Sequence, residues 1–277
     1  MSATVSNVIK QVILASIALA VIILSAAILF GQESSRPSSF CSNNDYWSSG
    51  VRAYSRDLRE MNIDPTGTLT VDAGQNGGVK VIGEERSDVL IRACVQAWGG
   101  NEAEAQERTK RVKIETDGVI RGTAEDKKFS VSFEIFVPLN MDLDLKARNG
   151  GLSVRNVSGK ITLNTENGGI AVADAGGKIK GTTENGGVSI VLNGTQWNGE
   201  GVDLETSNGG VSVTMSQHYS ANLEIQTVNG HLKSTLPGMT AVRNSRTTGQ
   251  TVNAAVNGGG APIKVRTVNG GLVVKER

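Results

Sequence analysis

A six-residue segment that ends in Asn-Gly-Gly recurs through the second half of the chain, and it constrains the fold more than any other feature. Six copies have the same length, and five of them carry Thr two positions before the Asn; five end in Asn-Gly-Gly, and the copy at 226–231 ends in Asn-Gly-His. An internal repeat of this kind indicates stacked structural units. The predicted turn residues are Asn149, Gly150, Gly151, Asn167, Gly168, Gly169, Asn185, Gly186, Gly187, Asn208, Gly209, Gly210, Asn229, Gly230, Asn269, Gly270 and Gly271.

Pairs of apolar residues at positions i and i+2 lie between these turns. The pairs begin at positions 143, 152, 161, 170, 179 and 188, each nine residues after the last. Such a pair with polar neighbours is typical of a short strand with one buried face. Two strands in every 18 residues predict an all-β fold, a right-handed β-solenoid whose coils must stack to hide their apolar faces. The alternative is that each Asn-Gly forms a two-residue hairpin turn. The constant length of the copies favours the solenoid.

The composition of the turn has a physical reason. A tight corner needs residues with positive φ, which Gly adopts freely and Asn tolerates. We therefore expect the glycines to supply positive φ at each corner. In stacked coils, identical Asn and Thr side chains could form ladders of hydrogen bonds.

The N-terminal part of the chain has a different character. Residues 12–30 form an apolar run broken only by Ser16 and Ser25, which is long enough to span a bilayer. We interpret it as an uncleaved membrane anchor, with a cleaved secretory signal as the alternative. The predicted domains are a transmembrane or signal segment (1–31), a polar linker (32–66) and the solenoid (67–277). On either alternative, the folded part lies outside the cytoplasm, in the periplasm or at the cell surface.

Two short elements and a disulfide are also predicted. Residues 51–61 could form a short helix. The order of charges in residues 101–111, acidic first and basic last, predicts a short solvated helix between strands, with a charge-rich binding helix as the alternative. If Cys94 faces out of its strand, it could form a disulfide with Cys41 in an oxidising compartment. The alternative is two thiols too far apart to bridge.

These features together resemble a known family. Strand pairs, a short charged helix, the Val137-Pro138 corner and serial Asn-Gly-Gly turns are similar to the bacterial putative-adhesin family of β-strand-repeat proteins. The family is a domain of unknown function. The resemblance covers roughly residues 67–277 and implies an extracytoplasmic domain behind one membrane segment. The name adhesin implies surface contact, and the family offers no catalytic residues to carry over.

The loops opposite the Asn-Gly-Gly turns lengthen along the chain. They span 155–160 and 173–178 and then grow to 191–201, 214–222 and 236–262, where the period is lost. Insertions on one side of a repeat array often mark its binding side. The candidate binding edge therefore consists of Trp197, His218, Tyr219, Arg243 and Arg246, with Met239 in the same loops. For Trp197 the sequence leaves binding and packing open, and for the others packing is the simpler interpretation.

Enzymatic and cofactor functions find little support. Some β-solenoids cleave polysaccharides with clustered carboxylates. However, Glu166 and Glu184, with Arg148 one coil earlier, fit a charge ladder on a solvated corner better. Two His and two Cys in the whole chain leave little for a metal, and a net charge of +1 gives no case for nucleic acid. We expect no cofactor and no catalysis. The predicted function is an adhesin-like binding or scaffold domain for an envelope glycan or protein, anchored through the N-terminal helix. A polysaccharide-acting lyase or hydrolase is the alternative.

Overall fold

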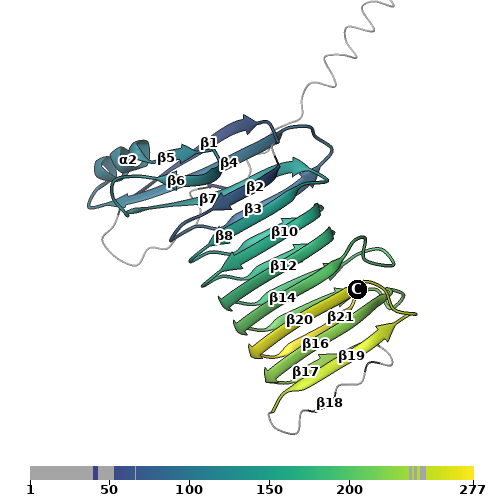
Figure 1. The fold of residues 1–277 in the computed structure, drawn as a ribbon. Helices are drawn as coiled ribbons and strands as arrows, with labels where there is room; N and C mark the ends of the chain where they lie inside the picture. The colour runs from purple at the N-terminus through teal and green to yellow at the C-terminus, as the bar shows by residue number, and fades with distance from the viewer. Residues whose placement is uncertain (1–39, 43–52, 66, 237–238, 240–241, 244–247) are drawn as a thin grey trace, which may run out of the picture. The chain divides into compact units, whose positions relative to one another are not determined.

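The computed structural model describes residues 40–42, 53–65, 67–236, 239, 242–243 and 248–277. The chain divides into two compact units, residues 1–42 and 43–277. The second unit contains all of the described strands and the helix α2 (Glu102–Arg111) (Figure 1).

The strands of the described residues form two large sheets. The ten-stranded sheet has the order β1 (Ala53–Ile63), β4 (Val89–Gly99), β7 (Phe129–Pro138), β3 (Val79–Glu84), β9 (Leu152–Arg155), β11 (Ile170–Ala173), β13 (Val188–Leu192), β15 (Val211–Met215), β21 (Leu272–Glu276), β17 (Leu232–Ser234). The eleven-stranded sheet has the order β18 (Val242–Arg243), β19 (Gln250–Val256), β16 (Ala221–Asn229), β20 (Pro262–Asn269), β14 (Gly201–Asn208), β12 (Gly176–Asn185), β10 (Ser158–Thr165), β8 (Asp142–Ala147), β2 (Thr68–Asp72), β6 (Val119–Thr123), β5 (Lys113–Glu115).

The regular middle of both sheets follows the period of the sequence. Ile161 in β10 pairs in parallel with Leu143 in β8 and with Ile179 in β12, a register of 18 residues on each side. Figure 1 shows these strands stacked one above another from β8 to β14. The apolar i, i+2 residues of both sheets are buried in one continuous core. Polar neighbours point outward, so the alternation in the sequence is the alternation of a strand with one buried face.

The prediction of a β-solenoid of successive coils is wrong. The two sheets are mixed, because β1, β4 and β7 pair antiparallel at one end and β16, β19 and β18 do so at the other. The stacking order also departs from the chain order. Strand β20 lies between β14 and β16, and β21 lies between β15 and β17. Strands β20 and β21, the last two of the chain, are therefore inserted inside the stack and do not extend it.

Two expectations near the N-terminus have different outcomes. The helix expected over 51–61 is wrong, because Ala53–Ile63 is strand β1, paired along its whole length with β4. Its side chains at alternate positions face the core side of β4, and this tertiary pairing overrides local helix propensity. Strand β1 also lies within the segment predicted as linker. No helix of the described residues is long and apolar enough to cross a membrane, and the apolar run 12–30 lies outside the described residues.

The charged helix is present where the sequence predicts it. The side chain of Asn101 caps the N-terminus of α2 by accepting from the backbone N–H of Glu104 at 2.9 Å. At the other end, the Arg59 guanidinium donates to the carbonyl oxygens of Thr109 and Val112. Helix ends leave carbonyls without intrahelical partners, and a cation there also suits the helix dipole. Strand β1 therefore fixes the helix to the sheet.

The Asn side chains of the turns form one ladder, which we call the Asn column. Each carboxamide donates to the Oδ1 of the next Asn at 2.9–3.4 Å, from Asn149 to Asn76 at one end and from Asn229 to Asn269 at the other. The predicted Asn ladder is therefore present. Its members in spatial order are Asn76, Asn149, Asn167, Asn185, Asn208, Asn269 and Asn229.

The glycines of the turn serve a purpose different from the one expected. None of the glycines predicted for these turns has a positive φ, so the expectation of left-handed corners is wrong there; Gly77, which follows Asn76, has a φ of +152°. A Cβ on the first glycine would meet backbone of the neighbouring turn, as at Gly209, where it would lie 2.0 Å from the carbonyl oxygen of Gly186. At the second glycine the approach is looser, and the Cβ of Gly271 would lie 3.8 Å from the carbonyl oxygen of His231. His231 stands in place of the second glycine in the last turn of the stack, beside β17, which is the terminal strand of its sheet.

The Thr side chains also differ from the expected ladder. Thr183 Oγ1 donates to the carbonyl oxygen of Gly168 at 2.7 Å, and Thr206 Oγ1 donates to that of Gly186 at 2.7 Å. Each Thr is buried and ties its own strand to the preceding turn of the stack. Each turn is thus held by hydrogen bonds between Asn side chains on its outer side, and by hydrogen bonds from Thr side chains to backbone carbonyl oxygens on its inner side. It forms a constant, rigid edge of the stack.

Candidate binding site

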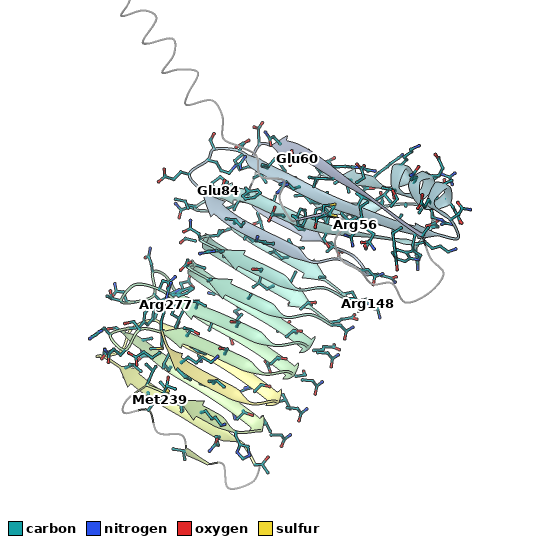
Figure 2. All side chains as sticks on the ribbon, turned by 180° about the vertical axis from the view of Figure 1, so that it is seen from behind. Arg56, Glu60, Glu84, Arg148, Met239 and Arg277 are labelled. Atoms are coloured by element: carbon teal, nitrogen blue, oxygen red, sulfur yellow. The ribbon has the colours of Figure 1, made fainter. Side chains whose placement is uncertain are left out.

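The edge opposite the Asn column is made of longer loops, and we call it the loop edge. It contains residues 193–200 between β13 and β14, residues 216–220 between β15 and β16, and residues 257–261 between β19 and β20. Figure 2 shows Arg148 on the Asn-column side and Met239 toward the loop edge. Because strands position both edges, the loops are presented at fixed places along the stack.

Two of the predicted binding residues are part of the core. Trp197 is 6% exposed, and its Nε1–H donates to the carbonyl oxygen of Gly177 at 2.9 Å. Tyr219 is 1% exposed, and burial raises the pKa of its hydroxyl to about 12. A ligand cannot reach either ring in this conformation. Of the two roles that the sequence left open for Trp197, the structure supports packing.

Hydrogen bonds join the three loops to one another. The backbone N–H of Ser220 donates to the carbonyl oxygen of Thr195 at 2.7 Å, which links the first two loops. Asn257 Nδ2 donates to the carbonyl oxygens of Gln217 and Tyr219 at 2.8 Å and 2.9 Å, which links the second loop to the third. The loop edge is therefore preorganised by its own contacts, and a partner would not need to order it.

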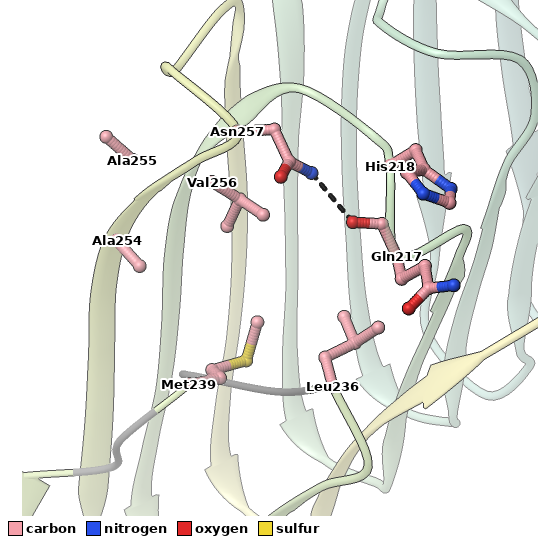
Figure 3. A pocket seen from close by; sticks show the side chains of 8 residues that line it. All are labelled: Gln217, His218, Leu236, Met239, Ala254, Ala255, Val256 and Asn257. Atoms are coloured by element: carbon pink, nitrogen blue, oxygen red, sulfur yellow. Dashed lines mark hydrogen bonds between the residues drawn. The ribbon is translucent and has the colours of Figure 1, made fainter.

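A pocket lies at the loop edge near the end of the stack. It has a volume of about 440 Å³ and is semi-open to solvent. Its apolar side is made by partly buried side chains of β19 and by the segment that follows β17, and its polar side is made by the loop at 216–220 and by Asn257 (Figure 3). We call it the loop-edge pocket. Its lining residues are Gln217, His218, Leu236, Met239, Ala254, Ala255, Val256 and Asn257.

The structure brings His218 and Met239, both named from the sequence, into this pocket and leaves other candidates outside it. His218 is exposed and lines the polar side. Arg243 lies in the two-residue strand β18, which pairs with β19, and Arg246 lies outside the described residues. Sequence reasoning missed Ala254 and Val256, because the period is lost in that region. Their alternation with Val252, which is buried, is the signal of a strand that could have found them.

Several charged side chains elsewhere on the stack form ion pairs. Arg148 Nε lies 2.7 Å from a Glu166 carboxylate oxygen at the Asn-column edge, as the charge-ladder interpretation expects. At the loop edge, Lys178 Nζ donates a hydrogen bond to Glu200 Oε2 at 2.6 Å. This hydrogen bond lowers the pKa of Glu200. Among the described residues, no group of three or more His, Cys, Asp or Glu side chains could hold a metal ion.

The cysteines are not free thiols. Both Cys41 and Cys94 are disulfide-bonded. Disulfides persist in oxidising compartments and are rare in the cytosol. The bridge between Cys41 and Cys94 remains a prediction to be tested by mapping the cross-linked peptide.

Comparisons with known proteins give structural likeness only. No protein-family model and no curated protein matches the chain. A putative cell adhesion protein from Clostridium sporogenes ATCC 15579 is 10% identical with a TM-score of 0.43, and the match covers 80% of this chain and 100% of that chain. A putative adhesin from Bacteroides fragilis NCTC 9343 is 12% identical with a TM-score of 0.34, covering 80% and 98%. A putative lipid binding protein from Parabacteroides distasonis ATCC 8503 is 9% identical with a TM-score of 0.26, covering 79% and 96%. Because all three TM-scores are below 0.5, no functional argument rests on them.

Proposed function

We propose that this chain is a non-catalytic binding or scaffold protein, adhesin-like in kind, that holds its partner at the loop-edge pocket. The observation that carries the proposal is the combination of a rigid stack with a preformed pocket on its variable edge. The Asn column fixes one edge, and hydrogen bonds between loops fix the other. Preformed concave sites with an apolar lining and a few polar groups are typical of binding sites.

The chemistry of the pocket favours a protein partner over a glycan. Sugar rings are commonly recognised by exposed aromatic side chains, and the rings expected to serve here, Trp197 and Tyr219, are buried. The pocket instead offers Leu236, Met239 and Val256 beside polar groups. Methionine adapts to differently shaped partners. An apolar side chain inserted between Met239 and Val256, with its backbone near His218, fits this lining.

The proposed compartment is outside the cytoplasm, in the periplasm or at the cell surface. The observation that supports it is the oxidised state of both cysteines. A fusion of the chain to a phosphatase that is active only after export tests the location. An inactive fusion, made in amounts equal to an exported control, would contradict it.

The binding proposal is tested with matched variants of the full chain. Ala254→Phe places a large side chain in the pocket, and Met239→Glu places a charge on its apolar side. Glu184→Gln changes an exposed residue on the Asn-column edge and is the matched control. The variants are immobilised and exposed to the solubilised envelope proteins and, separately, to the isolated envelope polysaccharide of the source cell. Thermal melting is recorded for each variant.

The expected result is retention of a defined envelope protein by the unchanged chain and by Glu184→Gln, with at least about tenfold less retained by both pocket variants, because each removes the complementary fit of a central contact. Equal retention by all variants would show that the pocket is not the site. Retention of polysaccharide that the pocket variants abolish would replace the protein partner by a glycan. Release of cleaved polysaccharide would contradict the non-catalytic function.

A further inference from the structure

The chain is unusually rich in Asn-Gly dipeptides, which are prone to spontaneous deamidation. In this reaction the backbone nitrogen of the glycine loses its proton and attacks the Asn side-chain carbon, and ammonia leaves. Water then opens the resulting succinimide to Asp or isoaspartate. Glycine favours the attack because it has no side chain to obstruct it. The ten Asn-Gly dipeptides begin at Asn76, Asn149, Asn167, Asn185, Asn193, Asn198, Asn208, Asn229, Asn257 and Asn269.

The Asn column hinders this reaction in its central members. Asn185 donates to the Oδ1 of Asn167 at 2.9 Å and accepts from Asn208 at 3.0 Å, so both ends of its carboxamide are held. The attacking nitrogen is also engaged, because the N–H of Gly186 donates to the carbonyl oxygen of Asn208 at 3.1 Å. Attack requires the Gly186 N–H to leave its acceptor and the carboxamide of Asn185 to rotate out of the column.

The same arrangement recurs at the neighbouring turns. The N–H of Gly209 donates to the carbonyl oxygen of Asn269 at 3.1 Å, and the N–H of Gly270 donates to that of Asn229 at 3.1 Å. The carboxamides of Asn208 and Asn269 each donate and accept within the column. Steric packing adds to this, because the first glycine of each turn lies directly against the neighbouring backbone. The turn has no room to rotate toward the succinimide.

The three remaining Asn-Gly dipeptides lie in the loop edge, and Asn193 is the least restrained of them. Asn193 Oδ1 is buried, and among the described residues nothing donates a hydrogen bond to it. Gly194 has a φ of +75° and open space around it. By contrast, the carboxamide of Asn257 is held by its two bonds to the loop at 216–220, and Gly199 is packed against Gly177.

We propose that Asn193 is the principal deamidation site of the native chain, and that the Asn column protects the seven asparagines of the turns. Asn257 follows Asn193 in rate. Deamidation of Asn257 would have the larger effect on the pocket. A carboxylate at position 257 would face the carbonyl oxygens of Gln217 and Tyr219, and it would release the loop that forms the polar side of the loop-edge pocket. The column therefore preserves the stack, and deamidation is confined to the loop edge.

Peptide mapping of the full chain during prolonged incubation at neutral pH tests the proposal. All ten sites are followed at once, and a sample unfolded in urea with reduced cysteines gives each site its intrinsic rate. In the native chain we expect the column sites to deamidate at least about tenfold more slowly than in the unfolded chain, because local opening that breaks several hydrogen bonds must come first. Asn193 should remain within about threefold of its unfolded rate, because its Oδ1 accepts no hydrogen bond within the described residues and the space beside Gly194 is open, so little has to open before the attack.

Two variants separate protection by the column from general stability. Asn269→Ser removes the acceptor of Asn229 and the donor to Asn208, so deamidation at those two sites should rise while Asn149 and Asn167 stay protected. Asn193→Gln removes the loop site and should leave every column rate unchanged. Column sites that deamidate at the unfolded rate, or a native Asn193 no faster than the column, would overturn the proposal. Melting curves show whether each variant remains folded.

Discussion

Replacing Gly209 by Ala tests why the turns contain glycine. A Cβ added at Gly209 would lie 2.0 Å from the carbonyl oxygen of Gly186, which belongs to a backbone fixed by the neighbouring coils. The adjacent Gly210 is a matched control in the same turn, because a Cβ there would lie 3.6 Å from the carbonyl oxygen of Gly271. Neither glycine has a positive φ, so only the packing differs between the two substitutions.

The expected loss follows from three contributions to the free energy of unfolding. Overpacking against fixed backbone costs about 1–3 kcal/mol. Displacement of the turn also weakens the bond from Asn208 to Asn185 and the bond from the Gly209 N–H to Asn269, each worth about 1 kcal/mol. The reduced flexibility of the unfolded chain offsets about 0.4–1 kcal/mol of this. The net loss for Gly209→Ala is about 3 kcal/mol, whereas Gly210→Ala stays within about 1 kcal/mol of the unchanged chain.

Thermal and urea unfolding of the two variants measure the difference. For a domain of this size, Gly209→Ala should lower the Tm by about 6–12 °C, since 1 kcal/mol corresponds to about 2–4 °C. Gly210→Ala should melt close to the unchanged chain. An equal loss of Tm at positions 209 and 210 would favour the earlier explanation, in which the backbone φ of the turn requires glycine. An unchanged Tm for Gly209→Ala would refute the packing argument altogether.

Three further predictions concern buried groups and the cysteines. Trp197→Ala should lower the free energy of unfolding by about 3–5 kcal/mol, as for other buried aromatic residues, and Trp197→Phe by less; urea unfolding that shows no loss would return Trp197 to the binding surface. One tyrosine should titrate with a pKa of about 12 in an ultraviolet absorbance titration of the folded chain, and Tyr219→Phe should remove it. Because the unfolded chain releases this proton at pH ~10, the Tyr219 contribution to stability is complete below that pH and is lost as the pH rises toward 12. Alkylation without reduction should label neither cysteine, and digestion should yield one cross-linked peptide that contains Cys41 and Cys94; labelled Cys94 would contradict this.

Much of the local structure could be predicted from the sequence. The apolar pairs that begin at Leu143, Ile161 and Ile179 occupy equivalent strand positions in the sheets. The charged helix and the Asn ladder also lie where the pattern places them. These features depend on neighbours in the sequence or on strict repetition, and both can be read without knowledge of the tertiary structure.

The order of the repeated strands in space could not be predicted, because the repeat makes them interchangeable. Asn208, Asn229 and Asn269 carry equivalent turns, and each can continue the same ladder. Periodicity identifies which residues are equivalent but not which are neighbours in space. The insertion of β20 between β14 and β16 depends on the length and path of the segment after β17. Strand β1 is hidden for a similar reason, since its strand conformation depends on β4, which is distant in sequence.

The candidate site was only partly predictable. The unequal loop lengths correctly located the loop edge. Residue type alone, however, did not indicate which side chains in these loops are exposed. Trp197 and Tyr219 suggest binding because exposed aromatics often do so, yet both fill the core between the loops. The residues that form the apolar side of the pocket, Ala254 and Val256, are small and carry no signal by themselves.

Site-specific photo-crosslinking in intact cells of the source tests directly whether the chain binds a protein partner at the loop-edge pocket. A photoreactive amino acid replaces Ala255, which is exposed and lines the loop-edge pocket, or Glu184 on the Asn-column edge. We expect a discrete protein adduct from position 255 that Ala254→Phe abolishes, and none from position 184. The absence of any adduct at position 255, or the same adducts from both positions, would contradict the claim that this chain binds its partner at the loop edge.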